Sequence, residues 1–252
     1  RINKSTNYLY QIFKPVFNQN FEKIDIILIL NRVIGNFNSF DKNFFQKESI
    51  DSIMMKAEKA LNNQYDILSF KEVLGVNNNW HKDFISDYEW TKGKFYKKYK
   101  IIDYLNDSDV KVCWEFNRCH HMIHLGQAYL ITGDEKFAKK ILFQINDWID
   151  ENPLMYSINW TCAMDVSIRA INWIYAFNMI IDSKIVDDNF IKKINKSLYQ
   201  HGWFIYRNLE DNYDKESDNH YDSNLVGLLL LGLIFESFKE GSKWKKFAVK
   251  EL

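Results

Sequence analysis

Apolar residues recur every three to four positions through the centre of the chain, between Cys113 and Ile181. Three sets share this spacing: Met122, Leu125 and Tyr129; Phe137, Ile141, Ile145 and Trp148; and Val166, Ala170, Trp173 and Phe177. Such a step places each set on one side of an α-helix. Short turns join the three segments, so the pattern predicts helices that pack antiparallel to one another.

Two polar stretches mark the turns between these helices. Thr132-Gly133-Asp134 supplies a turn followed by an N-cap, and Glu151-Asn152-Pro153 ends the second helix, because proline cannot continue it. Glu115, Asn117 and Arg118 are expected to open the first helix.

The flanking sequence extends the helical pattern in both directions. Residues 1–47 carry apolar stripes and are predicted to form a helical arm, and Ser49–Asn62 is predicted to be a further helix. Tyr65–Trp80 changes character, and short extended pieces and loops are expected there. We expect a domain organisation of 1–47, then 48–112 as a helix with a loop-rich segment, then a helical core over 113–252.

Two more helices are predicted towards the C-terminus. Asp187 or Asp188 is expected to cap a helix that carries Phe190, Ile194 and Leu198. Asn219–Glu236 is apolar almost throughout, so this helix should be buried on more than one side.

Composition supports helices and argues against several partners. Only 2 prolines and 9 glycines occur beside 19 Phe, 14 Tyr and 8 Trp, which favours helices over a turn-rich β fold. Lys+Arg and Asp+Glu both number 33, so the formal net charge is zero and the chain has no overall positive potential to attract nucleic acid. Nucleic acid is therefore not expected as a partner. The longest apolar run, Leu225–Phe235, is too short to span a bilayer.

The cysteines and the first residue give limited information on disulfides and on the natural N-terminus. Cys113, Cys119 and Cys162 are odd in number and form no CxxC pair, so we interpret them as small buried residues. The chain begins at Arg1 without a signal-like apolar segment, so we expect the natural N-terminus to be missing or processed.

Several motifs follow one another in a familiar order. They are WHKD at Trp80–Asp83, WEFNR at Trp114–Arg118, TGDEKFA at Thr132–Ala138, INWTCAMDVSIRAINW at Ile158–Trp173 and DNH at Asp218–His220. This series resembles the helical N-terminal domain of the heparinase II/III family, bacterial polysaccharide lyases that include heparan-sulfate and alginate lyases. The resemblance implies an all-α fold, an incomplete (α/α) toroid of antiparallel helical hairpins. We expect the C-terminal β-sandwich domain of the family to be missing from this chain.

The resemblance also implies a reaction, β-elimination on a uronic acid unit, without any cofactor. A base removes the weakly acidic proton at C5, so a donor must neutralise the neighbouring carboxylate. Asn219 would bind that carboxylate, and His220 would act as a base or a second donor. Without the resemblance, Asn219 is interpreted simply as the cap of the apolar helix that follows.

Further polar residues are candidates for sugar binding. The resemblance places Asn117, Arg118 and one of the neighbouring histidines, for which we choose His121, at the cleft, and Asn159 and Trp160 with them. Arg118 and Arg169 can pair bidentately with a carboxylate or a sulfate. Ion pairs with Glu115 or Asp165 are equally compatible with the two arginines, and packing in the core is equally compatible with Trp160.

A metal site is not predicted. His120 and His124 share a helical face, but no carboxylate ligand stands at the spacing that a HExxH motif requires.

Three functions remain open. The first is a lyase acting on an acidic polysaccharide, whether glycosaminoglycan-like, alginate-like or a bacterial surface polysaccharide, with periplasmic or secreted localisation implied by the resemblance. The family's catalytic Tyr and its β-domain His have no counterpart before Leu252, so this chain is expected to be the inactive N-terminal part of a longer enzyme. The second is a toroidal glycoside hydrolase using Glu115 and Asp165. The third is a non-catalytic polysaccharide-binding or assembly scaffold.

Overall fold

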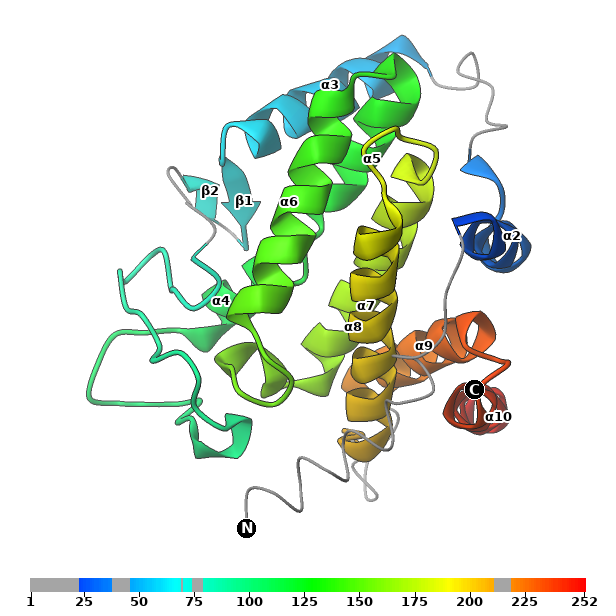
Figure 1. Ribbon diagram of the computed structural model, residues 1–252. Coiled ribbons are helices and arrows are strands. Elements are labelled where there is room, and N and C mark those ends of the chain that lie inside the picture. The colour runs from blue at the N-terminus through cyan, green and yellow to red at the C-terminus, as the bar shows by residue number, and fades with distance from the viewer. Residues whose placement is uncertain (1–22, 38–45, 69, 74–78, 211–218) are drawn as a thin grey trace.

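The computed structural model describes residues 23–37, 46–68, 70–73, 79–210 and 219–252, and the chain they form is mostly helical (Figure 1). The elements are α2 (Lys23–Ile34), α3 (Lys47–Leu61), β1 (Tyr65–Ile67), β2 (Phe70–Val73), η3 (Tyr96–Lys98), α4 (Val110–Asn117), α5 (His121–Thr132), α6 (Glu135–Glu151), η4 (Ile158–Trp160), α7 (Ala163–Ile180), α8 (Asp188–Arg207), α9 (Asn219–Ile234) and α10 (Lys239–Glu251). Within the described residues, the sheet structure is one antiparallel hairpin, β1–β2. The predicted all-α fold is therefore confirmed.

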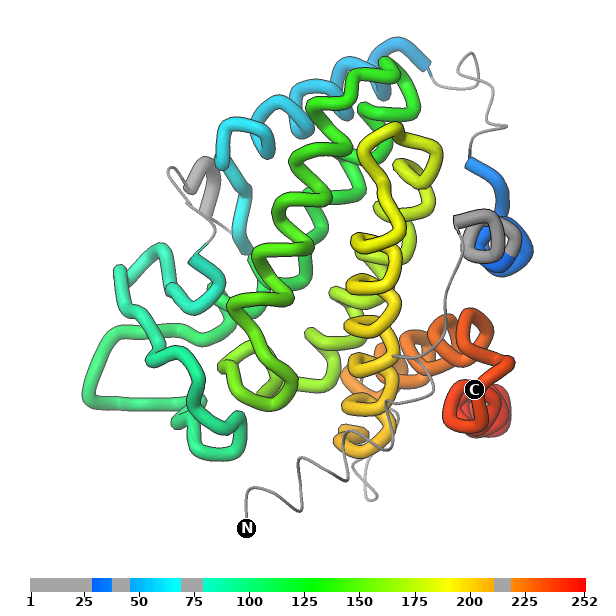
Figure 2. Tube along the Cα trace, viewed as in Figure 1, coloured from blue at the N-terminus to red at the C-terminus, as the bar shows by residue number. Residues whose placement is uncertain are grey.

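The helices form hairpins that stand side by side in two layers. The chain doubles back between α5 and α6 and again between α7 and α8, so successive helices run antiparallel (Figure 2). Helix α7 contacts α5 on one side and α9 on the other, whereas α8 contacts α6 and α10. One layer thus contains α5, α7 and α9, and the other contains α6, α8 and α10. This double layer is the arrangement that an (α/α) toroid requires, and the toroid itself stays a prediction.

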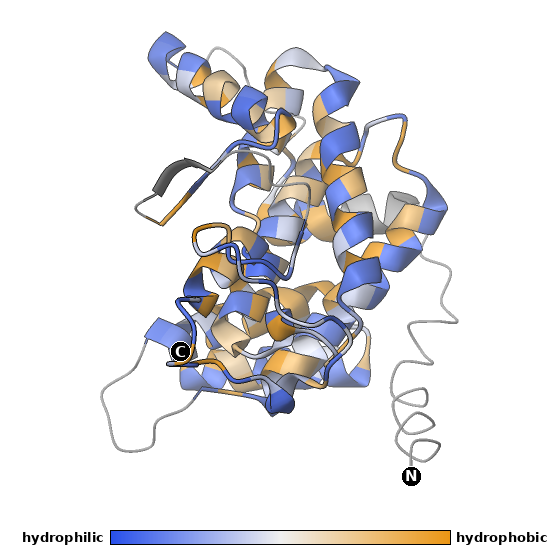
Figure 3. Cartoon of the chain, turned by 90° about the vertical axis from the view of Figure 1, so that its left-hand side faces the viewer, coloured by the Kyte–Doolittle hydropathy of each residue, from blue (hydrophilic) through white to orange (hydrophobic). Residues whose placement is uncertain are grey.

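Helix α7 lies at the centre of the fold and packs closely against both neighbours in its layer. A Cβ added at Gly126 of α5 would lie 2.8 Å from the Met179 sulfur, and one added at Gly227 of α9 would lie 2.9 Å from the Ser167 Cβ. The absence of a side chain at these two positions lets the helix axes approach. Hydrophobic and hydrophilic residues follow one another within single helices, and the apolar ones gather inside (Figure 3).

Side-chain caps fix where several helices begin. Asp134 accepts a hydrogen bond from the backbone N–H of Lys136 at 3.0 Å, and Asp187 accepts one from Phe190 at 2.8 Å. Both caps were predicted, as was the end of α6 before Pro153. Each cap satisfies an N–H group that has no partner within its helix.

The residues Glu115, Asn117 and Arg118 correct one prediction, because they end a helix rather than open one. They close the short helix α4, and the chain breaks at Cys119, whose φ is +61°, before α5 begins. The amide of Asn172 on α7 donates to the Arg118 carbonyl oxygen at 2.8 Å. This contact satisfies a carbonyl that the break removes from the helical ladder.

The WHKD motif anchors the long loop between the β hairpin and α4. The Trp80 indole N–H donates to Asp147 Oδ2 of α6 at 2.8 Å, and the Trp80 carbonyl oxygen accepts from the amides of Asn117 and Asn159 at 3.0 and 2.6 Å. Asp83 accepts from the backbone of Ile85 and from the distant backbone N–H of Asp109, so it ties both ends of the loop together.

The predictions for the segments before and after the central helices are confirmed in part. Helix α3 and the short strands lie where the sequence predicted them, and α9 is buried against α7, α8 and α10, as expected. Helix α10 was not assigned from the sequence. Residues 1–22 and 38–45 of the predicted arm lie outside the described residues. Cys113, Cys119 and Cys162 are free and buried, as predicted.

Replacing Asp83 tests the anchoring of the loop. Asp83→Ala removes the buried carboxylate that accepts from the N–H groups of Ile85 and Asp109, so the free energy of unfolding should fall by about 2 kcal/mol in urea denaturation. Asp107→Ala is the matched control in the same loop, because Asp107 is exposed, and it should change stability by less than about 0.5 kcal/mol. Equal effects of the two substitutions would contradict the anchoring role.

Candidate functional site

The first two residues of α9 carry the pair that the sequence singled out. Asn219 is exposed, and its amide makes no hydrogen bond to any other residue in the described part of the chain, so the structure shows no capping contact for it. His220 follows on the same turn and is partly buried, with 37% of its side chain exposed. The amide of Asn219 is therefore presented to solvent at the position directly before His220.

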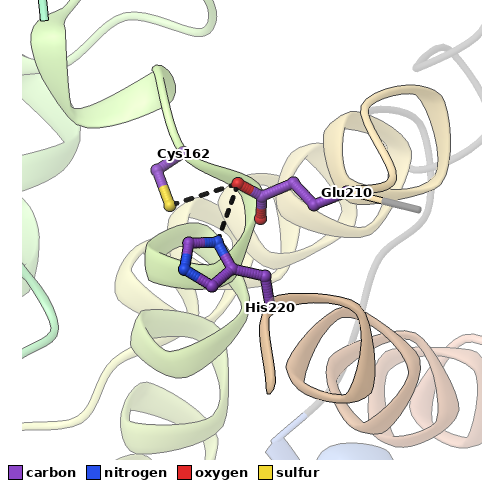
Figure 4. Close-up of side chains that lie close together, drawn as sticks. All are labelled: Cys162, Glu210 and His220. Carbon is purple, nitrogen blue, oxygen red and sulfur yellow. Dashed lines mark hydrogen bonds and ion pairs between the residues drawn. The ribbon is translucent and has the colours of Figure 1, made fainter. Parts of the chain in front are cut away.

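Glu210 holds the imidazole of His220 from the start of the connection between α8 and α9. Its Oε1 lies 3.2 Å from Nδ1 of His220, and its Oε2 accepts the backbone N–H of Met164, in the first turn of α7, at 2.7 Å (Figure 4). The backbone N–H of Glu210 donates to Asn224 Oδ1 at 2.9 Å. The start of α9, the start of the connection after α8 and the start of α7 thus meet at one carboxylate.

Arg118 joins two further carboxylates next to this junction. Its Nε donates to Asp165 at 2.5 Å, and its Nη1 donates to Glu115 at 2.6 Å. Burial opposes the charge of Arg118, but Asp165 and Glu115 outweigh it, so the pKa of the guanidinium lies above its ordinary value. The ion-pair interpretation of Arg118 is the one that the structure shows.

Asn117 and Asn159 were predicted to bind sugar, and the structure instead places both inside the protein at about 1% exposure. Asn117 donates to the Trp80 carbonyl and accepts the indole N–H of Trp148 at 2.7 Å. Asn159 donates to the Trp80 carbonyl and to Asn152. Both amides form hydrogen bonds with buried backbone and indole groups. They therefore stabilise the interior next to the candidate site and do not line it.

Trp160 and Arg169 are likewise placed in the interior rather than at a surface. The Arg169 guanidinium lies 4.0 Å from the ring centroid of Trp148 and 5.5 Å from that of Trp160. Its Nε donates to Nε2 of His201 at 3.0 Å, and the His201 Nδ1 contacts the Ser197 carbonyl oxygen at 2.7 Å. A carboxylate or sulfate of a polysaccharide has no access to a fully buried guanidinium.

The electrostatics of this buried pair are consistent with its contacts. Burial lowers the pKa of Arg169 to about 10, so the guanidinium stays charged at neutral pH. Burial and the adjacent Arg169 charge hold the pKa of His201 well below its ordinary value, so the imidazole is neutral. A neutral ring accepts the arginine proton at one nitrogen and donates from the other.

His121 lies away from the Asn219 pair, in a pocket of about 190 Å³ between α3, β1 and α5. The pocket is lined by polar and charged groups that include Lys56, Lys59, Glu115, His120, His121 and His124. The Nε2 of His121 lies 3.0 Å from Gln144, and its ring stacks on Phe116. Burial lowers the pKa of His121 to about 3, so this histidine is neutral at physiological pH.

A paired-helix fold with an Asn–His pair at the start of a buried helix is consistent with a family of carbohydrate-active proteins, and the comparisons identify it. The family model described as Heparinase II/III N-terminus matches residues 35–252. The chain therefore belongs to the heparinase II/III family.

Individual relatives agree with this assignment. The chain is similar to the heparin-sulfate lyase of Pedobacter heparinus, with 25% identity over 170 residues, covering 62% of this chain and 25% of that protein. It is also similar to the heparin-sulfate lyase of Bacteroides stercoris, with 23% identity over 162 residues, covering 56% of this chain and 23% of that protein. The matched region thus spans about a quarter of each curated relative.

Solved structures show the same fold. The structure of heparan sulfate lyase HepC from Pedobacter heparinus superposes with a TM-score of 0.67 at 19% identity, covering 90% of this chain and 33% of that one. A heparinase III structure gives a TM-score of 0.59 at 17% identity, covering 95% of this chain and 35% of that one. None of the helices in the described ranges is long and apolar enough to cross a membrane.

Two residues of the site were missed in the sequence. Glu210 was not among the candidate residues, and Cys162 was interpreted only as a small buried residue. Their position against His220 depends on how α7 and α9 pack, and the sequence contains no local signal of that contact. The single available signal was that Cys162 directly precedes an apolar helix, where an N-cap belongs.

The pocket histidine predicts a pH dependence of stability. The folded pKa of His121 is about 3 against 6.5 when unfolded, so below pH 6.5 the unfolded chain binds the proton and the folded chain does not. The contribution of His121 is fully present above pH 6.5 and is lost as the pH falls towards 3. In His121→Gln, the fall in unfolding free energy between about pH 6 and pH 4 should be shallower by up to about 1.4 kcal/mol per pH unit.

Urea denaturation of both proteins across that range provides the measurement. The m-values of the two proteins should agree, which shows that the same surface is exposed in each. Carboxylates titrate in both proteins alike, so the difference between the two slopes isolates His121. Parallel slopes would show that the ring accepts a proton without leaving its folded environment.

Proposed function

We propose that this chain forms the helical N-terminal part of a bacterial polysaccharide lyase that cleaves a uronic-acid-containing polysaccharide by β-elimination. The observation that carries the proposal is the exposed Asn219 amide beside a His220 ring anchored on Glu210, in a chain of the heparinase II/III family. Both relatives cited above are named heparin-sulfate lyases, so a glycosaminoglycan of that type is the proposed first substrate.

The chemistry assigns a separate task to each of the two residues. Removing the C5 proton of a uronate places a second negative charge next to its carboxylate, and an amide N–H donated by Asn219 would stabilise that charge without losing a proton itself. Glu210 fixes the ring orientation of His220, as a carboxylate commonly does for a catalytic imidazole. His220 would then take up the C5 proton or donate a second hydrogen bond to the substrate.

Of the other residues predicted to bind sugar, five already have partners within the protein or are buried, and His121 lines a pocket. Arg118 is occupied by Glu115 and Asp165, and Asn117, Asn159, Trp160 and Arg169 lie inside. We propose that these five residues position the start of α7 and the loop below it. The pocket of His121, with Lys56 and Lys59 on its wall, is the proposed place for an anionic sugar group.

The glycoside hydrolase hypothesis receives no support from these contacts. Glu115 and Asp165 share one guanidinium, so both are paired within the protein instead of facing each other across an open space. An inverting or retaining pair needs room for a sugar between its carboxyl groups. The scaffold hypothesis differs from the lyase only in turnover, and the following experiment separates the two.

The proposed lyase activity is tested with the full-length product of the gene. Incubation with heparan sulfate, and in parallel with alginate, should raise the ultraviolet absorbance of the unsaturated uronate that β-elimination creates. Asn219→Ala should lower kcat/KM by about 10²- to 10³-fold, the usual effect of removing a donor that stabilises a developing anion. The exposed Asp222 lies one turn into the same helix, so Asp222→Asn is the matched control and should change kcat/KM less than about twofold.

Two results would redirect the assignment. Binding of the polymer with no new absorbance, by the full-length protein, would identify a scaffold instead of an enzyme. Equal activity of the wild type and Asn219→Ala would keep a lyase but remove Asn219 from its mechanism. We further propose that residues 1–252 alone are inactive, which the same assay on the isolated chain measures.

A further inference from the structure

Three potential metal ligands from separate parts of the chain meet at the start of α7. They are the thiol of Cys162 just before α7, the carboxylate of Glu210 in the connection after α8, and the imidazole of His220 in α9 (Figure 4). One ligand atom of each lies within 4.8 Å of the others. Among the residues that the structure describes, no other group of three His, Cys, Asp or Glu side chains meets this criterion.

The separations match those around a tetrahedral metal ion. Glu210 Oε1 lies 3.2 Å from His220 Nδ1 and 3.5 Å from Cys162 Sγ. Zinc bonds of about 2.0 Å to oxygen and nitrogen and about 2.3 Å to sulfur place tetrahedral ligands roughly 3.3 Å (O to N) and roughly 3.5 Å (O to S) apart. Two of the three edges are therefore already at the right length, and the sulfur and the imidazole nitrogen lie within 4.8 Å of each other.

We propose that Cys162, Glu210 and His220 bind a thiophilic divalent cation, with Zn²⁺ as the preferred ion. A thiolate, a carboxylate and an imidazole favour zinc over calcium or magnesium, which prefer sites built from oxygen alone. Three protein ligands leave a fourth tetrahedral position for water or another small donor.

The surroundings hold the ligands in place for this role. The second oxygen of Glu210 accepts the backbone N–H of Met164, and its own N–H donates to Asn224, so the carboxylate is oriented before any ion arrives. Cys162 is the N-cap residue of α7, where the helix dipole favours a negatively charged sulfur. A thiolate and a carboxylate together balance the two positive charges of the ion in a half-buried place.

Metal binding exchanges a proton for the ion. Burial holds the pKa of the Cys162 thiol above its ordinary value, so without metal the sulfur keeps its proton and donates it to Glu210. Coordination forms the sulfur–zinc bond and releases that proton to the solvent. The imidazole binds the ion through Nδ1 in its neutral form, with the proton on the other ring nitrogen, so the metal-bound ring could serve the proposed function as a hydrogen-bond donor and not as the base.

Cobalt(II) titration of the purified 252-residue chain tests the proposal without any activity assay. Cobalt replaces zinc in such sites, and a cobalt–thiolate bond produces a near-ultraviolet charge-transfer band. The wild type should develop this band with visible absorption typical of tetrahedral cobalt, and added Zn²⁺ should abolish both. Absence of the band in the wild type would overturn the proposal.

Variants assign the band to this site. Cys162→Ser should abolish it while Cys113 and Cys119 remain, so a band that survives would point to another thiol and overturn the assignment. His220→Gln should weaken cobalt binding by about 100-fold or more, since losing even a hydrogen-bond partner of a ligand costs about 10- to 100-fold. His124→Gln is the matched control, because His124 lies elsewhere on α5 against Gln127, and it should leave the titration unchanged.

Circular dichroism of each variant confirms that it is folded before titration. His220 is partly exposed in the first turn of its helix, so His220→Gln is the variant least dependent on packing, and unchanged cobalt affinity in it counts against the site. The spectrum does not depend on the proposed lyase reaction. Loss of lyase activity with an intact cobalt spectrum would therefore reject the proposed function and leave the metal site standing.

Discussion

A single buried positive charge organises the interior of this protein. Arg169 of α7 lies against Trp148 of α6 and Trp160 of η4, and it donates to His201 of α8. A guanidinium out of contact with water is costly unless its donors and its charge are satisfied, so the three neighbouring elements are constrained to stay where they are. Cation–π contact stabilises the charge, and the His201 imidazole and the Asn159 carbonyl oxygen accept from Nε and Nη2, whereas Nη1 is buried without a hydrogen-bond partner in the described part of the chain.

This constraint reaches the candidate site along α7. Asp165 stands one turn before Arg169, Met164 precedes it, and Cys162 caps the helix. Fixing Arg169 among the tryptophans therefore fixes the end of α7 that offers a backbone N–H to Glu210 and a carboxylate to Arg118. The polar contacts around His220 rest on a helix whose own position is set about two turns deeper in the protein.

The sequence predicted the features that depend on neighbours along the chain. Helical spacing of apolar residues identified α3 and α5 to α9, and the caps Asp134 and Asp187 were correct because a cap is a contact over two or three residues. The break between α4 and α5 was missed because Asn172, on another helix, stabilises it. The resemblance placed Asn117 and Asn159 at the sugar cleft, and Arg169 was a candidate because a guanidinium pairs with anions; their burial depends on partners distant in the sequence.

Within the candidate site, the limit is of the same kind. Asn219 and His220 were identified from a motif, and both are at least partly accessible to solvent. Glu210 and Cys162 come close to His220 only because α7 and α9 pack together. Neither the sequence around Glu210 nor the start of α9 contains a pattern that predicts this contact. Glu210 lies ten positions before His220, and the sequence between them is mostly polar.

The central position of α7 has a consequence for motion. Its neighbours are helices on both sides of its layer and across to the other layer, and most of its side chains are buried. Its amide hydrogens can exchange with solvent only when the whole domain opens, whereas α9 begins at the surface with an exposed residue. The first turn of α7 is thus a rigid boundary of the candidate site, and local opening near His220 is expected from the α9 side.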